Sequence, residues 1–262
     1  MLHGKRIGAV IIAYQAAKTI GETLRAVPRE VVDHLIVCDD GSTDGTAELS
    51  TSLGALTYRS PVNRGAGANT KLGFERLLER TDLDVLVLLH GDNQYDPARI
   101  PALAEPIALG HCDAVLGNRV HWARGSMPVY KRLGNTALTW VQNRVFGVEL
   151  RDYATGYKAF ARTVLESLDW AGNKDDFEFD EQLNAQLLLR GFRVENVPVP
   201  TRYFPEASSV NLRGSVRYGI QTLKATGAAL AWRMGLRPAY AVRLFRSPEA
   251  RSATEARPPE LS

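Results

Sequence analysis

The stretch Leu88-Leu89-His90-Gly91-Asp92-Asn93-Gln94-Tyr95-Asp96-Pro97 decides the fold. The apolar run Val85 to Leu89 leads directly into this polar segment, as expected of a buried parallel strand whose carboxyl end faces a ligand. His90 and Asp92 are two apart in an extended chain, so they point to one side, with Gln94 as a candidate third member; one nitrogen and one or two oxygen donors suit Mg²⁺ or Mn²⁺. A polar loop that only satisfies its own backbone is an equally good interpretation of this stretch alone.

Apolar strand-like runs and helical runs alternate around this stretch. We expect strands at 6–13, 34–38, 55–58, 85–89 and 113–117, with helices at 19–27, 47–53, 97–109 and one ending near 79. This alternation predicts an α/β fold, a mostly parallel, Rossmann-like sheet with helices on both faces. Further along we expect a loop at 119–127, helices at 128–145 and 177–189, an irregular segment at 151–160 and a late strand at 192–197.

The C-terminal part has a distinct composition. Eight basic residues and one acidic residue, Glu206, lie between Arg202 and Arg246, which favours an anionic partner. Helical spacing of apolar residues over 215–234 predicts an amphipathic helix with a basic back; these residues are Val216, Ile220, Leu223, Leu230 and Met234. We therefore expect a main domain at 1–205, a basic helical segment at 206–246 packed on or beside it, and a disordered tail at 247–262.

Composition also limits the class of protein. A net charge of +3 over 262 residues argues against a dedicated nucleic-acid binder. Cys38 and Cys112 each lie in or beside an expected strand, which favours small buried hydrophobes in a reducing compartment. Without an apolar run of about 20 residues, we expect a cytoplasmic protein.

Polar residues also follow the second and third expected strands. Asp39 and Asp40 could accept hydrogen bonds from a ribose or base, or they could serve only the turn. Gly65 and Gly67 would let the backbone approach a ligand closely, and Arg64 could meet a phosphate. Neither the dinucleotide fingerprint nor the P-loop pattern is present, which argues against a dehydrogenase and a P-loop enzyme.

Three later segments carry candidate residues with structural alternatives. The segment 151–158 mixes a carboxylate, hydroxyls and cations suited to sugar or phosphate, as a solvated loop also would. Asp180 and Glu181 open a helix, where acidic residues usually complement its dipole. Arg202 and Arg213 could bind a diphosphate or a lipid phosphate, or form a solvated basic face.

Six motifs follow one another along the chain, namely Ala9-Val10-Ile11-Ile12-Ala13-Tyr14, Val37-Cys38-Asp39-Asp40-Gly41-Ser42-Thr43-Asp44-Gly45-Thr46, Asn63-x-Gly65-x-Gly67-Ala68, Gly91-Asp92-x-Gln94, Thr155-Gly156-Tyr157-Lys158 and Val197-Pro198-Val199-Pro200-Thr201-Arg202-Tyr203. In this order they resemble the family 2 glycosyltransferases with the GT-A fold, and within them the dolichol-phosphate mannose synthases and polyprenyl-phosphate sugar synthases. The resemblance spans roughly residues 6–235.

The resemblance implies roles for individual residues. Asp92 would be the last Asp of an Asp-x-Asp element, with Gln94 as a further ligand of Mg²⁺ or Mn²⁺. Arg202 would reach a phosphate, and 155–158 would lie near the acceptor. The full set comprises catalytic Asp92, Asp180 and Arg202, metal-binding His90, Asp92 and Gln94, and donor-binding Ala13, Tyr14, Asp39, Asp40, Asn63, Arg64, Gly67, Gly91, Lys158 and Arg213.

The sequence departs from the family in three ways. His90 stands where the family usually has the first Asp, which makes the metal site less anionic. The segment 12–16, Ile-Ala-Tyr-Gln-Ala, replaces the usual Pro-x-Tyr-Asn-Glu and removes a carboxylate from the nucleotide pocket. The C-terminal membrane helices of some relatives are absent, so we expect any lipid contact to be peripheral, on the cytoplasmic face of the membrane.

The function expected from this resemblance is metal-dependent, inverting transfer of a hexose from a GDP- or UDP-sugar to a polyprenyl or dolichyl phosphate. A phosphate monoester has a second pKa of about 6 and needs no general base, whereas a hydroxyl acceptor would need one, for which Asp180 is the candidate. The alternatives are transfer to a hydroxyl of a glycan or small molecule, and a catalytically silent nucleotide-sugar-binding protein.

Overall fold

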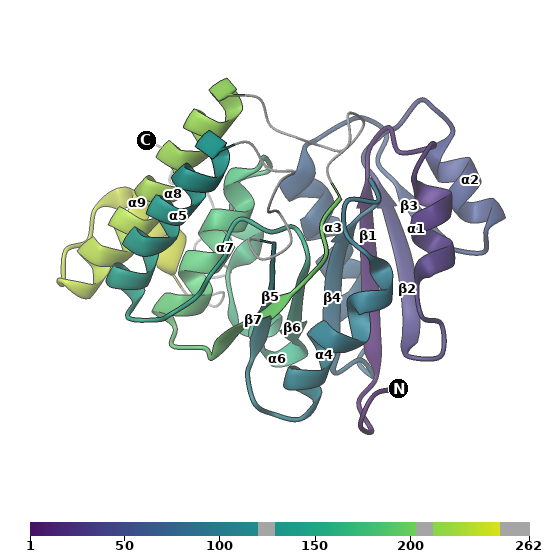
Figure 1. Ribbon diagram of the computed structural model, residues 1–262, viewed down its shortest axis with the longest axis horizontal. Helices are drawn as coiled ribbons and strands as arrows, with labels where there is room; N and C mark the ends of the chain where they lie inside the picture. Colours follow the sequence, from purple (N-terminus) through teal and green to yellow (C-terminus); the bar gives the residue numbers. More distant parts are fainter. Residues whose placement is uncertain (120–128, 203–211, 247–262) are drawn as a thin grey trace, which may run out of the picture.

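The computed structural model describes residues 1–119, 129–202 and 212–246 and contains a seven-stranded sheet (Figure 1). The strand order is β3-β2-β1-β4-β6-β5-β7, and β6 alone runs antiparallel to its neighbours. The strands are β1 (Ile7–Ala13), β2 (Val32–Asp39), β3 (Leu56–Arg59), β4 (Val85–His90), β5 (Ala114–Asn118), β6 (Lys158–Ala161) and β7 (Val194–Pro198). The predicted mostly parallel α/β fold is confirmed.

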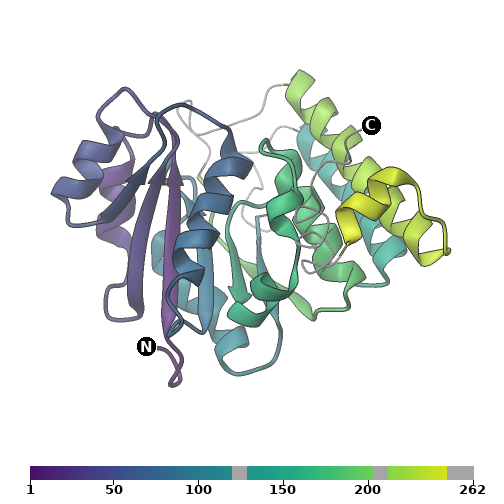
Figure 2. The same ribbon diagram turned by 180° about the vertical axis from the view of Figure 1, so that it is seen from behind.

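Helices cover both faces of the sheet. The helices are α1 (Ile20–Ala26), α2 (Thr46–Ser52), α3 (Ala66–Leu78), α4 (Ile100–Ala108), α5 (Val129–Phe146), α6 (Arg162–Ser167), α7 (Glu178–Leu189), α8 (Leu212–Arg233) and α9 (Ala239–Phe245), with short 3₁₀ turns at Pro97–Arg99 and Trp170–Gly172. Helices α1 and α4 lie on the face seen in Figure 1, while α3, α6 and α7 lie on the face seen in Figure 2.

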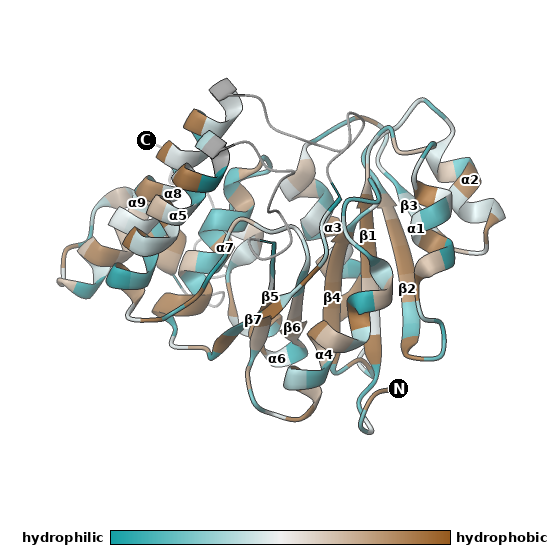
Figure 3. Cartoon of the chain, in the orientation of Figure 1, coloured by the Kyte–Doolittle hydropathy of each residue, from teal (hydrophilic) through white to brown (hydrophobic). Residues whose placement is uncertain are grey.

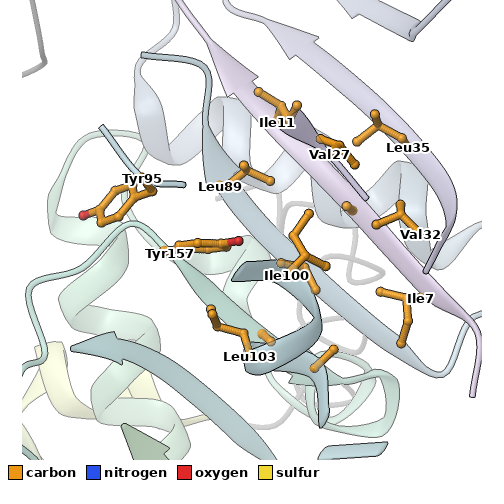
Figure 4. Close-up of a cluster of buried hydrophobic side chains, with 14 of the residues drawn as sticks. Ile7, Ile11, Val27, Val32, Leu35, Leu89, Tyr95, Ile100, Leu103 and Tyr157 are labelled. Carbon is orange, nitrogen blue, oxygen red and sulfur yellow. The ribbon is translucent and has the colours of Figure 1, made fainter. Parts of the chain in front are cut away.

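Two hydrophobic clusters sandwich the sheet because successive side chains of a strand point to opposite faces. Ile11 and Leu89 pack against Ile100 of α4 on one face (Figure 4). Val10 and Leu86 pack against Phe74 of α3 on the other. Strands covered on both faces read as continuous apolar runs, which is why the sequence predicted β1 and β4.

Three elements of the sheet and its surroundings differ from expectation. The segment 151–160, expected to be irregular, contains the start of β6, and α6 and α9 were not predicted at all. The tail at 247–262 lies outside the described residues.

The C-terminal helices form a third layer, in which α8 packs against α5 and α7. The predicted amphipathic helix corresponds to α8, and its apolar stripe faces outward. Its large apolar residues are exposed, whereas Tyr218, Thr222 and Ala225 face the protein. Within the described part of the chain, no helix combines the length and the apolar character needed to cross a membrane.

Candidate functional site

The polar segments after β2, β1 and β4 meet at one edge of the sheet. These three strands are neighbours, with Ala13 of β1 opposite Asp39 of β2 and Ile12 of β1 opposite His90 of β4. Gly91 continues this contact, because its N–H donates to the carbonyl of Ile12 at 2.9 Å. The parallel register therefore brings together side chains that lie far apart in the sequence.

Asp39 is fully buried at the end of β2. It accepts hydrogen bonds from the hydroxyl and the backbone N–H of Ser42, and Arg59 Nε lies 3.6 Å from its Oδ2. Burial raises the pKa of Asp39, although the Ser42 hydrogen bonds and the Arg59 charge oppose this shift. Asp39 is thus a shielded carboxylate at the edge where we expect the nucleoside.

Asp40 organises the neighbouring loop. Its two carboxylate oxygens accept the backbone N–H groups of Arg64 at 2.9 Å and Gly65 at 2.8 Å. This fixes the loop beside β2 and leaves the side chains of Asn63 and Arg64 exposed, while Tyr14 after β1 is 51 % exposed. Asn63, Arg64 and Tyr14 are therefore accessible to a ligand at this edge.

The glycines of this loop serve a different contact from the one expected. A Cβ atom at Gly67 would lie 2.6 Å from the carbonyl oxygen of Lys174, and one at Gly65 would lie 2.5 Å from that of Asp175. Asp175 also accepts the backbone N–H of Ala68 at 3.1 Å. The chain's own segment occupies the space next to Gly67 that we had expected a ligand to approach.

The segment after β4 forms a tight polar turn. The Asp92 carboxylate accepts the backbone N–H of Gln94 at 3.0 Å, and Asn93 between them adopts a left-handed conformation with φ of 57°. Gln94 is buried, whereas His90 and Asp92 are partly exposed. The turn therefore keeps His90 and Asp92 accessible at the carboxyl end of β4.

Gly156 packs directly against the His90 ring. A Cβ atom at position 156 would lie 2.5 Å from both Cε1 and Nε2 of the imidazole. The N–H of Gly156 donates to the Tyr95 hydroxyl at 3.1 Å, and the Tyr95 ring meets the His90 ring edge-on with centroids 6.2 Å apart. Gly156 and Tyr95 thus fix the position of His90, a role the sequence motif did not reveal.

Arg202 reaches the same segment through its backbone. Its N–H donates to the carbonyl of Gln94 at 2.9 Å, and Thr201 bridges to Tyr95. Its guanidinium is exposed and lies 3.4 Å from Glu22, a surface pair of little energetic weight. Arg202 is therefore tethered beside the turn with a side chain able to reorient. Arg213 lies on α8, and its side chain is outside what the structure describes.

Lys158 differs from its expected role in donor binding. Its side chain is fully buried in β6, and its ammonium lies 2.6 Å from Asp180 Oδ1 and 3.3 Å from Asn184 Oδ1. A ligand cannot reach this ammonium directly. Asp180, the candidate general base, is instead the counter-ion of a buried lysine.

Two carboxylates, Glu181 and Asp152, are more deeply buried than the sequence indicated. Glu181 accepts hydrogen bonds from Tyr218 and Gln142, and burial raises its pKa despite the Tyr218 hydrogen bond. Burial by itself would raise the pKa of Asp152. The charge of Arg119 and the two hydrogen bonds from its guanidinium have the opposite effect, and the pKa of Asp152 is lowered. An isolated Glu or Asp in a polar stretch gives no sequence signal of such burial.

The donor set at this edge fits a divalent cation that arrives with a diphosphate. Among the described residues, no three His, Cys, Asp or Glu side chains cluster as a ready metal site. Mg²⁺ is commonly held by one or two protein ligands together with substrate phosphates. His90 and Asp92 are the accessible donors at this edge. Gln94 is buried, because the chain turns after β4 instead of continuing as the extended segment that we expected.

Comparisons with known proteins identify the family of this chain. Residues 9–169 match the pattern of Glycosyl transferase family 2. The chain is 28 % identical over 202 residues to a dolichyl-phosphate hexose transferase of Haloferax volcanii, covering 75 % of this chain and 82 % of that protein. It is 27 % identical over 233 residues to an undecaprenyl-phosphate mannosyltransferase of Micrococcus luteus, covering 84 % of this chain and 90 % of that protein.

The fold is likewise shared with solved structures. The crystal structure of glucosyl-3-phosphoglycerate synthase from Mycobacterium tuberculosis with uridine diphosphate aligns with a TM-score of 0.66 at 22 % identity, covering 90 % of this chain and 82 % of that chain. A crystal of the same protein contains Mn²⁺ and UDP-glucose. The chain belongs to glycosyl transferase family 2 and is a glycosyltransferase with the GT-A fold.

Proposed function

We propose that this glycosyltransferase moves a hexose, with inversion and with the help of Mg²⁺ or Mn²⁺, from a GDP- or UDP-sugar to a polyprenyl or dolichyl phosphate. Relatives named for transfer to dolichyl and undecaprenyl phosphate support the acceptor class. The reaction would take place on the cytoplasmic face of a membrane, with the protein in peripheral contact with it.

The ion pair between Asp180 and Lys158 carries the choice of acceptor. A hydroxyl acceptor needs a base that takes up its proton. If Asp180 took up that proton it would lose its charge, and the fully buried Lys158 ammonium would be left uncompensated, which is costly. A phosphate monoester is largely ionised at neutral pH and needs no such base. The arrangement therefore favours a phosphate acceptor.

The residues at the sheet edge divide between the two parts of the donor. The exposed Tyr14 and Asn63 are our candidates for direct contact with the nucleoside. Asp39 is fully buried and would reach the nucleoside only if the Ser42 turn moves, while Asp40 positions the loop. Arg64 carries an exposed cation on that loop, and we assign it to the phosphates together with Arg202 and Arg213.

His90 and Asp92, with Gln94, would hold the metal ion. The ion would supply neutralisation of the negative charge that grows on the leaving diphosphate. In the same step an oxygen of the acceptor phosphate forms a bond to the anomeric carbon as the bond to the diphosphate breaks. This single displacement inverts the anomeric configuration and requires no protein nucleophile.

A direct test is to incubate the protein and Mn²⁺ or Mg²⁺ with a panel of GDP- and UDP-hexoses and a short-chain polyprenyl phosphate. The matched control acceptor is the polyprenol of the same chain length, which offers a hydroxyl without the phosphate. We expect a lipid-linked sugar with the phosphate only. Glycosylation of hydroxyl acceptors alone would overturn the acceptor assignment, and failure to consume any donor would indicate a silent nucleotide-sugar-binding protein.

A further inference from the structure

The polarity of α8 is inverted relative to a helix that packs its apolar face inward. Five large apolar residues recur at helical spacing on the exposed face, with exposures from 44 to 68 %; these are Val216, Ile220, Leu223, Leu230 and Met234. The buried face carries small or hydroxyl-bearing side chains, namely Tyr218, Thr222, Ala225, Thr226 and Ala229. Packing within the protein therefore does not account for the apolar stripe. Figure 3 shows hydrophobic and hydrophilic residues interspersed along α8.

Helix α5 repeats this inversion beside α8. Leu133 and Trp140 are 63 % and 61 % exposed, whereas Thr139 and Gln142 are buried. The two helices pack side by side, as Figures 1 and 2 both show. Among the described residues, the buried hydroxyls of Thr139 and Thr226 have no hydrogen-bond partner, which costs folding free energy. Both helices thus bury polar groups and expose large apolar ones, although Phe146 at the end of α5 is buried.

The charge of these helices has a single sign. The segments 129–146 and 212–246 contain no Asp or Glu, and their basic residues are Lys131, Arg132, Arg144, Arg213, Arg217, Lys224, Arg233, Arg237, Arg243 and Arg246. Two of the arginines lie over tryptophan rings, Arg144 at 5.6 Å from the Trp140 centroid and Arg237 at 4.0 Å from that of Trp232. Arg217, Lys224 and Arg246 form ion pairs with Asp176, Glu178 and Asp169 on other elements, while the two segments themselves carry no carboxylate that would offset the other cations. Apolar side chains beside Lys, Arg and Trp match the boundary between the headgroups and acyl chains of an anionic bilayer.

A second copy of the chain fits this surface less well. A two-fold contact would bring the same cationic helices of both copies together, and like charges at close range repel. An anionic lipid surface offers the complementary charge. The position of α5 and α8 also suits membrane docking, because their first turns lie at the end of the molecule towards which β1 and β4 run, where the candidate site is (Figure 1).

We propose that the outward faces of α5 and α8 form a docking surface for an anionic lipid bilayer, defined by Leu133, Trp140, Val216, Ile220, Leu223, Leu230 and Met234. This inference rests on the proposed function, because docking would bring the candidate site at the sheet edge to the membrane that supplies the lipid phosphate. The basic side chains contact the headgroups while the apolar side chains enter the acyl boundary.

The test is co-sedimentation with vesicles of phosphatidylcholine and phosphatidylglycerol mixed in equal parts, free of polyprenyl phosphate. The variant Leu133→Gln/Ile220→Gln removes two exposed apolar side chains from the surface. The matched control, Leu56→Gln/Leu109→Gln, alters leucines that are 49 % and 47 % exposed on β3 and after α4. We expect the surface variant to bind about tenfold or more weakly, the control to bind as the wild type, and vesicles of phosphatidylcholine alone to bind less.

These experiments test docking to the bilayer separately from sugar transfer. Equal binding of the surface variant and the wild type, or no binding of either, overturns the docking surface. Self-association that the surface variant abolishes, without vesicle binding, would identify a second copy as the occupant and overturn it too. Transfer to a water-soluble, short-chain polyprenyl phosphate tests the proposed function independently, because that acceptor needs no bilayer.

Discussion

The substitution Gly156→Ala tests whether the position of His90 matters for transfer. The new Cβ would lie 2.5 Å from Cε1 and Nε2 of the His90 ring, whereas carbon atoms in contact are normally about 3.5–4.0 Å apart. The ring or the 155–157 turn must therefore move by about 1 Å. A displacement of this size at a reacting centre can lower activity about 100-fold, and overpacking costs about 1–3 kcal/mol of unfolding free energy.

The assay combines kcat/KM for sugar transfer with denaturant unfolding. Gly21→Ala on α1 is the matched control, because its nearest non-local atoms are at an ordinary 3.6 Å and both activity and stability should be kept. In a His90→Ala background the clash is gone, so Gly156→Ala should cost less than about 0.5 kcal/mol. Wild-type activity of Gly156→Ala, or an equal stability loss in both backgrounds, would refute the reasoning.

Four further outcomes are expected. Asp92→Asn should abolish metal-stimulated transfer, measured across a Mn²⁺ titration, and wild-type rates would remove Asp92 from the site. His90→Asp should keep activity or increase the use of Mg²⁺ in the same titration, whereas a folded but inactive variant would show that His90 has another role. Asp180→Ala should lower the unfolding free energy by about 3–5 kcal/mol, because it leaves the buried Lys158 ammonium uncompensated. Adding Lys158→Met should restore most of that free energy. An unchanged denaturation midpoint for the single variant would contradict the ion pair. Burial raises the pKa of Glu181 above 4.5, so its contribution to stability is present below that value and is lost as the pH rises through the raised value. Glu181→Gln should therefore flatten the dependence of Tm on pH, and parallel curves for variant and wild type would contradict this.

The sequence predicted the elements whose signal is local. Strands β1 and β4 are continuous apolar runs because both of their faces are covered, and that pattern needs no tertiary information. Strand β6 was missed because it spans only Lys158–Ala161 and begins with a charged residue. The partner that makes this charge tolerable, Asp180, comes from a distant helix.

Part of the candidate site could also be predicted from local sequence signals. The rule that ligands bind at the carboxyl ends of parallel strands placed His90 and Asp92 at a ligand-binding edge, and the family resemblance added Asp39 to it. The sequence could not show that the backbone of 174–176 occupies the space beside Gly67, because that contact joins segments about 100 residues apart. Periodicity likewise predicted the stripe on α8 but not its direction, since a 3.6-residue repeat is the same whether the stripe faces the core or the solvent.

The place of β6 in the sheet also constrains synthesis on the ribosome. Strand β5 pairs with β6 and β7, both of which emerge later, so β5 has no earlier strand to join. Between Asn118 and Lys158 the nascent chain carries an apolar strand with open edges for about 2–8 s at ordinary translation speeds. During this interval the first four strands can already pair with one another. Chaperone capture of stalled chains should therefore be strongest for those that end after β5 and before β6.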